Sequence, residues 1–156
     1  MRVSLNFYNT DLYSKAGLQG EPKNGAEFVS YSQKIKEATG AWGTNIALTG
    51  ILLYRYWYSG LYQDGGTLLT PDLNKAAFNS PSGIKSLQYW NDAVYKHKIS
   101  SDRPMGEGEG FRFGKLGMYL EGVWNINAYR QSQNLKWDIF PMLQIFKPGN
   151  RGYFAN

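Results

Sequence analysis

Helix-start signals recur along this sequence and separate short apolar segments. Asn9-Thr10-Asp11 can cap a helix that runs to Ala16, because a side-chain oxygen at the cap accepts a hydrogen bond from the first turn. Asn24, with Glu27 three positions later, is close to a capping box, and Ser80-Pro81 sets a cap before a proline suited to the first helical turn. These signals predict three separate helices.

Short segments typical of strands lie between and around these helices. Residues 3–7 alternate apolar and polar side chains, the pattern of a half-buried strand. Residues 118–121 and 137–141 indicate two more strands, and a further aromatic-rich helix is predicted over residues 50–63. Helices that alternate with short strands indicate the α/β class, and 156 residues suit a single domain over 1–156.

Apolar residues at helical spacing predict which side chains form the core. The stripe of the helix after Ser80 consists of Ile84, Leu87, Trp90 and Val94. Among the large aromatic residues, we assign four to the core: Phe28, Tyr89, Trp90 and Phe113.

Composition excludes several functions. The chain has 0 Cys and 1 His, which leaves no disulfide framework, thiolate zinc site or Cys nucleophile, and we predict no metal or cofactor. The net charge is +5, but basic residues never stand next to each other, whereas a nucleic-acid groove needs a clustered stripe. Aromatic residues make up 16% of the chain, and Tyr and Trp are enriched at recognition surfaces, so the excess favours a binding protein.

Two alternatives stay open at this stage. Glu121 and Asp64 are acidic residues that lie close in sequence to aromatic residues that could contact a ligand. A pair of carboxylates could cleave a glycosidic bond. A single-stranded nucleic-acid binder that uses basic and aromatic side chains is the third and weakest interpretation.

Five stretches, taken together and in order, resemble one family. They are FYNTDLYSKAGL (7–18), LYQDGG (61–66), AAFNSPSGIKSLQYWNDAVYKHKI (76–99), FGKLGMYLEGVWNI (113–126) and WDIFPM (137–142). They are similar to the extracellular solute-binding proteins of family 1, the sugar-binding subunits of ABC importers. Val123 departs from this family's usual Gly-Pro-Trp, but the Trp is kept.

The resemblance implies one lobe of a two-lobed, type II periplasmic-binding-protein-like fold, with a mixed sheet flanked by helices. Members of this family are more than twice as long, so the chain is expected to be a piece of a longer protein, most of its C-terminal lobe. Segments near 1–8 and 150–156 would then be hinge crossings that run side by side. The implied partners are a carbohydrate ligand, the other lobe and the membrane permease, and the implied location is extracellular or periplasmic.

The resemblance also implies a ligand site and no catalysis. Trp124 would stack on a sugar ring at a strand-to-helix junction, with Asn125 and backbone N–H groups of the new helix bonding the hydroxyls. Further candidate ligand-binding residues are Trp57, Tyr58, Trp42, Asp64 and Glu121. Each of the three aromatic residues could equally be a packing residue, and Glu121 fits a hydrogen-bonding role better than a catalytic one.

Overall fold

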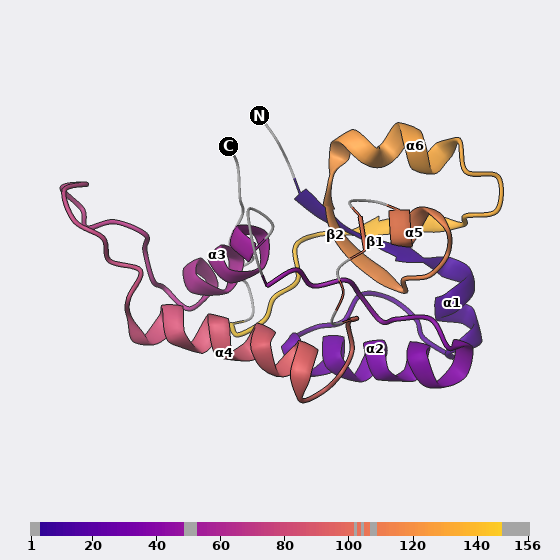
Figure 1. Ribbon diagram of the computed structural model, residues 1–156, viewed down its shortest axis with the longest axis horizontal. Helices are drawn as coiled ribbons and strands as arrows, with labels where there is room; N and C mark the ends of the chain where they lie inside the picture. Colours follow the sequence, from indigo (N-terminus) through magenta and orange to yellow (C-terminus); the bar gives the residue numbers. More distant parts are fainter. Residues whose placement is uncertain (1–3, 49–52, 102, 104, 107–108, 148–156) are drawn as a thin grey trace.

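The computed structural model describes residues 4–48, 53–101, 103, 105–106 and 109–147. Its elements alternate between helices and short strands, as the sequence predicts, and Figure 1 shows their arrangement. In chain order they are β1 (Ser4–Asn9), α1 (Thr10–Lys15), α2 (Gly25–Thr39), α3 (Leu53–Gln63), α4 (Pro81–Tyr95), α5 (Glu109–Arg112), β2 (Met118–Gly122), the 3-10 helix η2 (Val123–Asn125), α6 (Ile126–Arg130) and β3 (Trp137–Phe140).

The predicted caps begin the helices. Asn9 accepts a hydrogen bond from the Leu12 N–H at 3.0 Å to start α1, and Ser80 accepts from the Gly83 N–H at 3.2 Å to start α4. Asn24 accepts from the Glu27 N–H at 2.9 Å to start α2. The second half of that capping box differs, because the Glu27 carboxylate accepts from the Lys23 N–H, one residue before the cap.

The sheet has the order β2-β1-β3, and both pairings are antiparallel. Parallel pairing occurs beside it as isolated bridges, between Trp42 and Leu116 and between Thr44 and Ser100. The α/β class is therefore confirmed, with parallel pairing in single bridges instead of full strands. The predicted pairing of the first strand with residues 150–156 lies outside the described residues.

Two apolar clusters cover the two faces of this sheet. Met118 and Leu120 of β2 belong to the larger cluster, which includes Phe28 and Trp90. Tyr119 faces the other way and packs with a second aromatic cluster around Phe7. Figure 1 shows α2 and α6 on opposite sides of the sheet. Because both faces are buried, β2 is buried at every position.

Three predicted core positions are wrong for this chain. Ile84 and Leu87 of α4 are 63% and 46% exposed, and Phe113 is 67% exposed. Periodicity correctly indicates an apolar face on α4, but the described elements cover the part of it that holds Trp90 and Val94. Phe28 and Trp90 are buried as predicted, and Tyr89 is half-buried.

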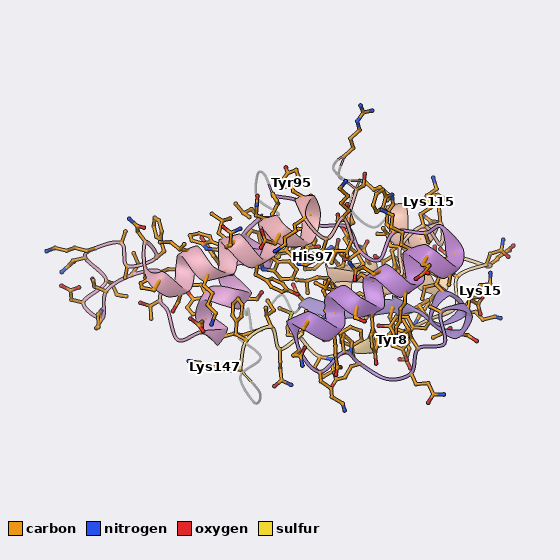
Figure 2. All side chains as sticks on the ribbon, turned by 90° about the horizontal axis from the view of Figure 1, so that it is seen from below. Tyr8, Lys15, Tyr95, His97, Lys115 and Lys147 are labelled. Atoms are coloured by element: carbon orange, nitrogen blue, oxygen red, sulfur yellow. The ribbon has the colours of Figure 1, made fainter. Side chains whose placement is uncertain are left out.

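Helix α4 ends at Tyr95. His97 lies just beyond the helix, where its backbone N–H bonds to the Asp92 carbonyl at 2.8 Å. Figure 2 shows Tyr95 and His97 at this end. The segment between α3 and α4 extends away from the sheet (Figure 1) and contains one isolated antiparallel bridge, between Leu69 and Ala76.

Candidate functional site

Trp124 lies where β2 passes into a helix. Strand β2 ends at Gly122, and η2 continues directly into α6. Trp124 is 43% exposed, and the neighbouring Asn125 is half-buried. Neither η2 nor α6 has a side-chain N-cap hydrogen bond. A large aromatic ring therefore stands at the molecular surface, directly beside the start of a helix.

A buried ion pair lies next to this Trp. The Arg55 Nη1 of α3 is 2.9 Å from the Glu121 Oε1 of β2, and the two side chains are 7% and 0% exposed. The same Glu121 oxygen accepts a hydrogen bond from the Gly122 N–H at 2.7 Å. A buried carboxylate needs such compensation, because desolvation of an unpaired charge is costly. Glu121 is thus a structural acceptor that ties α3 to the end of β2.

The Arg55 guanidinium also contacts Trp124. Its central carbon lies 5.3 Å from the centroid of the Trp124 ring, within the range of a cation–π contact. Arg55 belongs to the first turns of α3, so this helix positions the cation under the surface aromatic. The structure therefore brings together Glu121, Trp124 and Asn125 of the predicted site and adds Arg55 to them.

Trp57 and Tyr58 lie on α3 and pack with aromatic neighbours. The Trp57 indole N–H donates to the Gly83 carbonyl at 2.9 Å, and its ring meets Phe78 edge-on at 5.6 Å. Tyr58 contacts Trp57 and Tyr54, with ring centroids 5.3 Å and 5.9 Å away. Trp57 thus joins α3 to the start of α4, and ligand contact by these two residues stays a prediction.

Trp42 lies near the opposite end of β2 from Trp124. Trp42 forms a β-bridge with Leu116, which precedes β2, whereas Trp124 follows this strand. The length of β2, at about 3.3 Å per residue, therefore separates the two positions. The Lys36 ammonium lies 3.8 Å from the centroid of the Trp42 ring. The structure does not bring Trp42 to Trp124, and ligand contact by Trp42 stays a prediction.

Asp64 lies past the other end of α3. Nine positions separate it from Arg55, about 13 Å along a helix axis. The Lys85 ammonium donates to the Asp64 carboxylate at 2.6 Å and holds the pKa of that carboxyl below its ordinary value. Glu121 is paired with Arg55 near the beginning of α3, whereas Asp64 follows the end of this helix, so the two carboxylates are associated with opposite ends of α3.

Sequence reasoning missed Arg55 and Gly122. In the sequence, Arg55 is a charged residue inside an aromatic helix, which is a signal that it needs a buried partner. Its partner is 66 positions away, so only the folded chain reveals the pair. Among the described residues no three His, Cys, Asp or Glu side chains gather as metal ligands would.

Comparisons with known proteins agree on one family. The sequence profile of the bacterial extracellular solute-binding proteins matches residues 1–155. Among solved structures, the chain is similar to a Thermotoga lettingae ABC transporter solute-binding protein bound to α-D-tagatose, with 25% identity, a TM-score of 0.81, and coverage of 96% of this chain and 40% of that one. Maltose-bound T. maritima MalE3 matches with 25% identity, a TM-score of 0.80 and the same coverages.

A further solved structure and a curated relative also match. The cyclic α-maltosyl-1,6-maltose binding protein of Arthrobacter globiformis is 27% identical, with a TM-score of 0.76, and the match covers 96% of this chain and 38% of that one. A Brucella abortus protein described as a binding protein is 24% identical over 139 residues, 85% of this chain and 34% of that one. The chain thus spans about a third of the curated relatives' length.

These matches establish the family. The chain belongs to the bacterial extracellular solute-binding proteins, and its α/β architecture is that of their periplasmic-binding-protein-like fold. None of the helices in the described ranges is long and apolar enough to cross a membrane.

Proposed function

We propose that this chain forms part of the carbohydrate-binding component of an ABC importer, with Trp124 as the surface on which a sugar ring stacks. The observation that carries the proposal is the exposed Trp124 at the β2-to-η2 junction, beside Asn125 and the start of a helix. A pyranose presents apolar C–H faces and polar edges. An indole covers the faces, and amide and backbone donors bond the edges.

The charges around Trp124 favour a neutral ligand. Arg55 brings a positive charge to the ring, but the Glu121 carboxylate lies 2.9 Å from the Arg55 guanidinium and compensates that charge locally. A site for an anionic group would leave Arg donors directed at the ligand. A neutral sugar fits this compensated pair, and tagatose and maltose are the ligands named for two similar solved proteins.

In this proposal the chain supplies one wall of a cleft. A second lobe closes over the sugar, and the closed, ligand-bound state is the one presented to the membrane permease. Such a protein works outside the membrane, captures solute and performs no chemistry. The matched family and the share of about 40% of the solved chains support this two-lobe arrangement.

Titration of the purified chain with sugars tests the proposal. The ¹⁵N-labelled protein has 5 Trp, so its indole N–H signals can be followed one by one, with Trp124 assigned from Trp124→Phe. Addition of maltose, maltotriose or tagatose at tens of millimolar should shift the Trp124 signal. Trp42→Phe is the matched control and should leave that response intact. Sugars that shift no Trp124 signal would contradict the site.

The same samples separate the alternatives. A glycosidase would release products from maltotriose, and the products would vanish with Glu121→Gln. A nucleic-acid binder would show salt-sensitive shifts with oligothymidine. Either result, in the absence of a sugar response, would replace the proposed function.

A further inference from the structure

We infer that Gly122 and Arg55 fix the orientation of the Trp124 indole before any ligand binds, and that Glu121 acts through Arg55. All three are positioning residues. This inference rests on the proposed function only in its consequence, which is tighter sugar binding. The orientation of the ring is a property of the chain alone.

A glycine is needed at position 122 to make room for the Trp124 ring, and not to allow an unusual backbone conformation. Its φ of −83° and ψ of 155° are ordinary extended values that any residue adopts. A Cβ at this position would overlap the Cη2, Cζ3 and Cζ2 atoms of Trp124. The six-membered half of the indole therefore lies directly against the Gly122 backbone. An alanine here would be tolerated by the strand and would push the ring away.

Arg55 holds the ring from a second element. Its guanidinium carbon is 5.3 Å from the ring centroid, and the ion pair with Glu121 limits where that guanidinium can go. Glu121 is itself fixed by β2, in register with Leu5 of β1, and by the Gly122 N–H. The contacts thus run from β2 through the buried Glu121 carboxylate and the buried Arg55 guanidinium to the Trp124 ring at the surface.

Such preorganisation has a consequence for binding. A side chain already held in its bound orientation loses less conformational freedom when a ligand arrives. A loosened Trp124 would still be present and exposed, but it would stack less well. We expect sugar binding about 3- to 10-fold weaker in Gly122→Ala, the size of effect that immobilising one side chain produces.

The indole signals test the orientation without ligand. In Gly122→Ala and in Arg55→Lys, the Trp124 N–H signal should move clearly, while the other assigned Trp signals stay close to their wild-type positions. Arg112→Met is the matched control, because Arg112 is an exposed arginine that bonds Ser132. An unmoved Trp124 signal in Gly122→Ala would overturn the inference, even if Arg55→Lys proved too unstable to study.

Sugar titration of the same variants gives the second readout. Followed by the backbone amide signals of residues 123–126, Gly122→Ala should weaken the response to maltotriose about 3- to 10-fold, whereas Arg112→Met should leave it at the wild-type value. A response of Gly122→Ala as strong as that of the wild type would overturn the positioning role in binding. If Trp124→Ala alone leaves the sugar response unchanged, the proposed function fails, while a moved indole signal still supports the positioning role.

Discussion

Trp124 and Trp90 show how differently one residue type is used within this chain. Trp90 is 2% exposed and packs against Phe28, Tyr56 and Tyr89, whereas Trp124 stands at the surface. The Trp90 indole N–H is also bonded to the Tyr56 carbonyl at 2.7 Å. Removal of each ring should therefore have opposite consequences for stability and for binding.

We expect Trp90→Ala to lower the free energy of unfolding by about 3–5 kcal/mol, as truncation of a buried aromatic residue does. Trp124→Ala should lower it by about 1 kcal/mol or less, because the Trp124 side chain is already 43% exposed. Urea melts of the two variants beside wild type measure both values. Equal destabilisation would show that Trp124 is a core residue and would remove it from the binding site.

Asp64 allows a prediction about pH. Hydrogen bonding from Lys85 is the main reason that the pKa of Asp64 lies below its ordinary value. Because the folded pKa is the lower one, this pair stabilises the folded chain above the ordinary carboxyl pKa, and the contribution is lost as the pH falls through the lowered value. Lys85 is half exposed, so the effect on stability should be about 1 kcal/mol or less.

Lys85→Met should raise the pKa of Asp64 toward the value of a free carboxyl. Carbon-detected NMR titration of the Asp64 carboxyl measures this shift directly. Lys34→Met, on the exposed face of α2, is the control and should leave it unchanged. No difference between the two variants would mean that Lys85 and Asp64 are not paired in solution.

At the scale of elements, the sequence predicts where helices begin more reliably than which faces they bury. Side-chain caps act within one turn, so Asn9, Asn24 and Ser80 can be read locally. Burial depends on what packs against a helix, and the sequence pattern carries no such information. Ile84 and Leu87 follow the correct period, yet the described elements leave them exposed.

This difference predicts a contrast between two isoleucines. Ile84→Ala should change the unfolding free energy by less than about 1 kcal/mol, because its side chain is already solvated. Ile35→Ala should cost about 2–5 kcal/mol, since Ile35 of α2 is fully buried in the larger cluster. Thermal or urea melts compare the pair. A large loss in Ile84→Ala would indicate that α4 is covered in solution, for instance by a second copy of the chain.

At the scale of the whole molecule, the sequence supports the fold and only part of the site. Family resemblance points to Trp124 and Asn125, and the matched family confirms the fold that it implies. Trp42 and Asp64 carry suitable side chains, but the topology places them away from Trp124. Arg55 belongs to the site in the folded chain but is not predicted from the sequence. Its role depends on a contact between α3 and β2, which no local pattern in the sequence specifies.

The whole-molecule prediction concerns affinity. The chain spans about 40% of its solved relatives, and a sugar on Trp124 alone would stay largely wet on its other side. Burial of most of the ligand surface is what gives a binding protein its affinity, and one wall of a cleft cannot provide it. We expect dissociation constants for maltose and maltotriose of about 1 mM or weaker, near −4 kcal/mol. Calorimetry on the purified chain measures these constants, and Trp124→Ala should abolish the heat of sugar binding. Micromolar binding would contradict the one-wall interpretation and would require a complete site within these residues or a dimer that builds one.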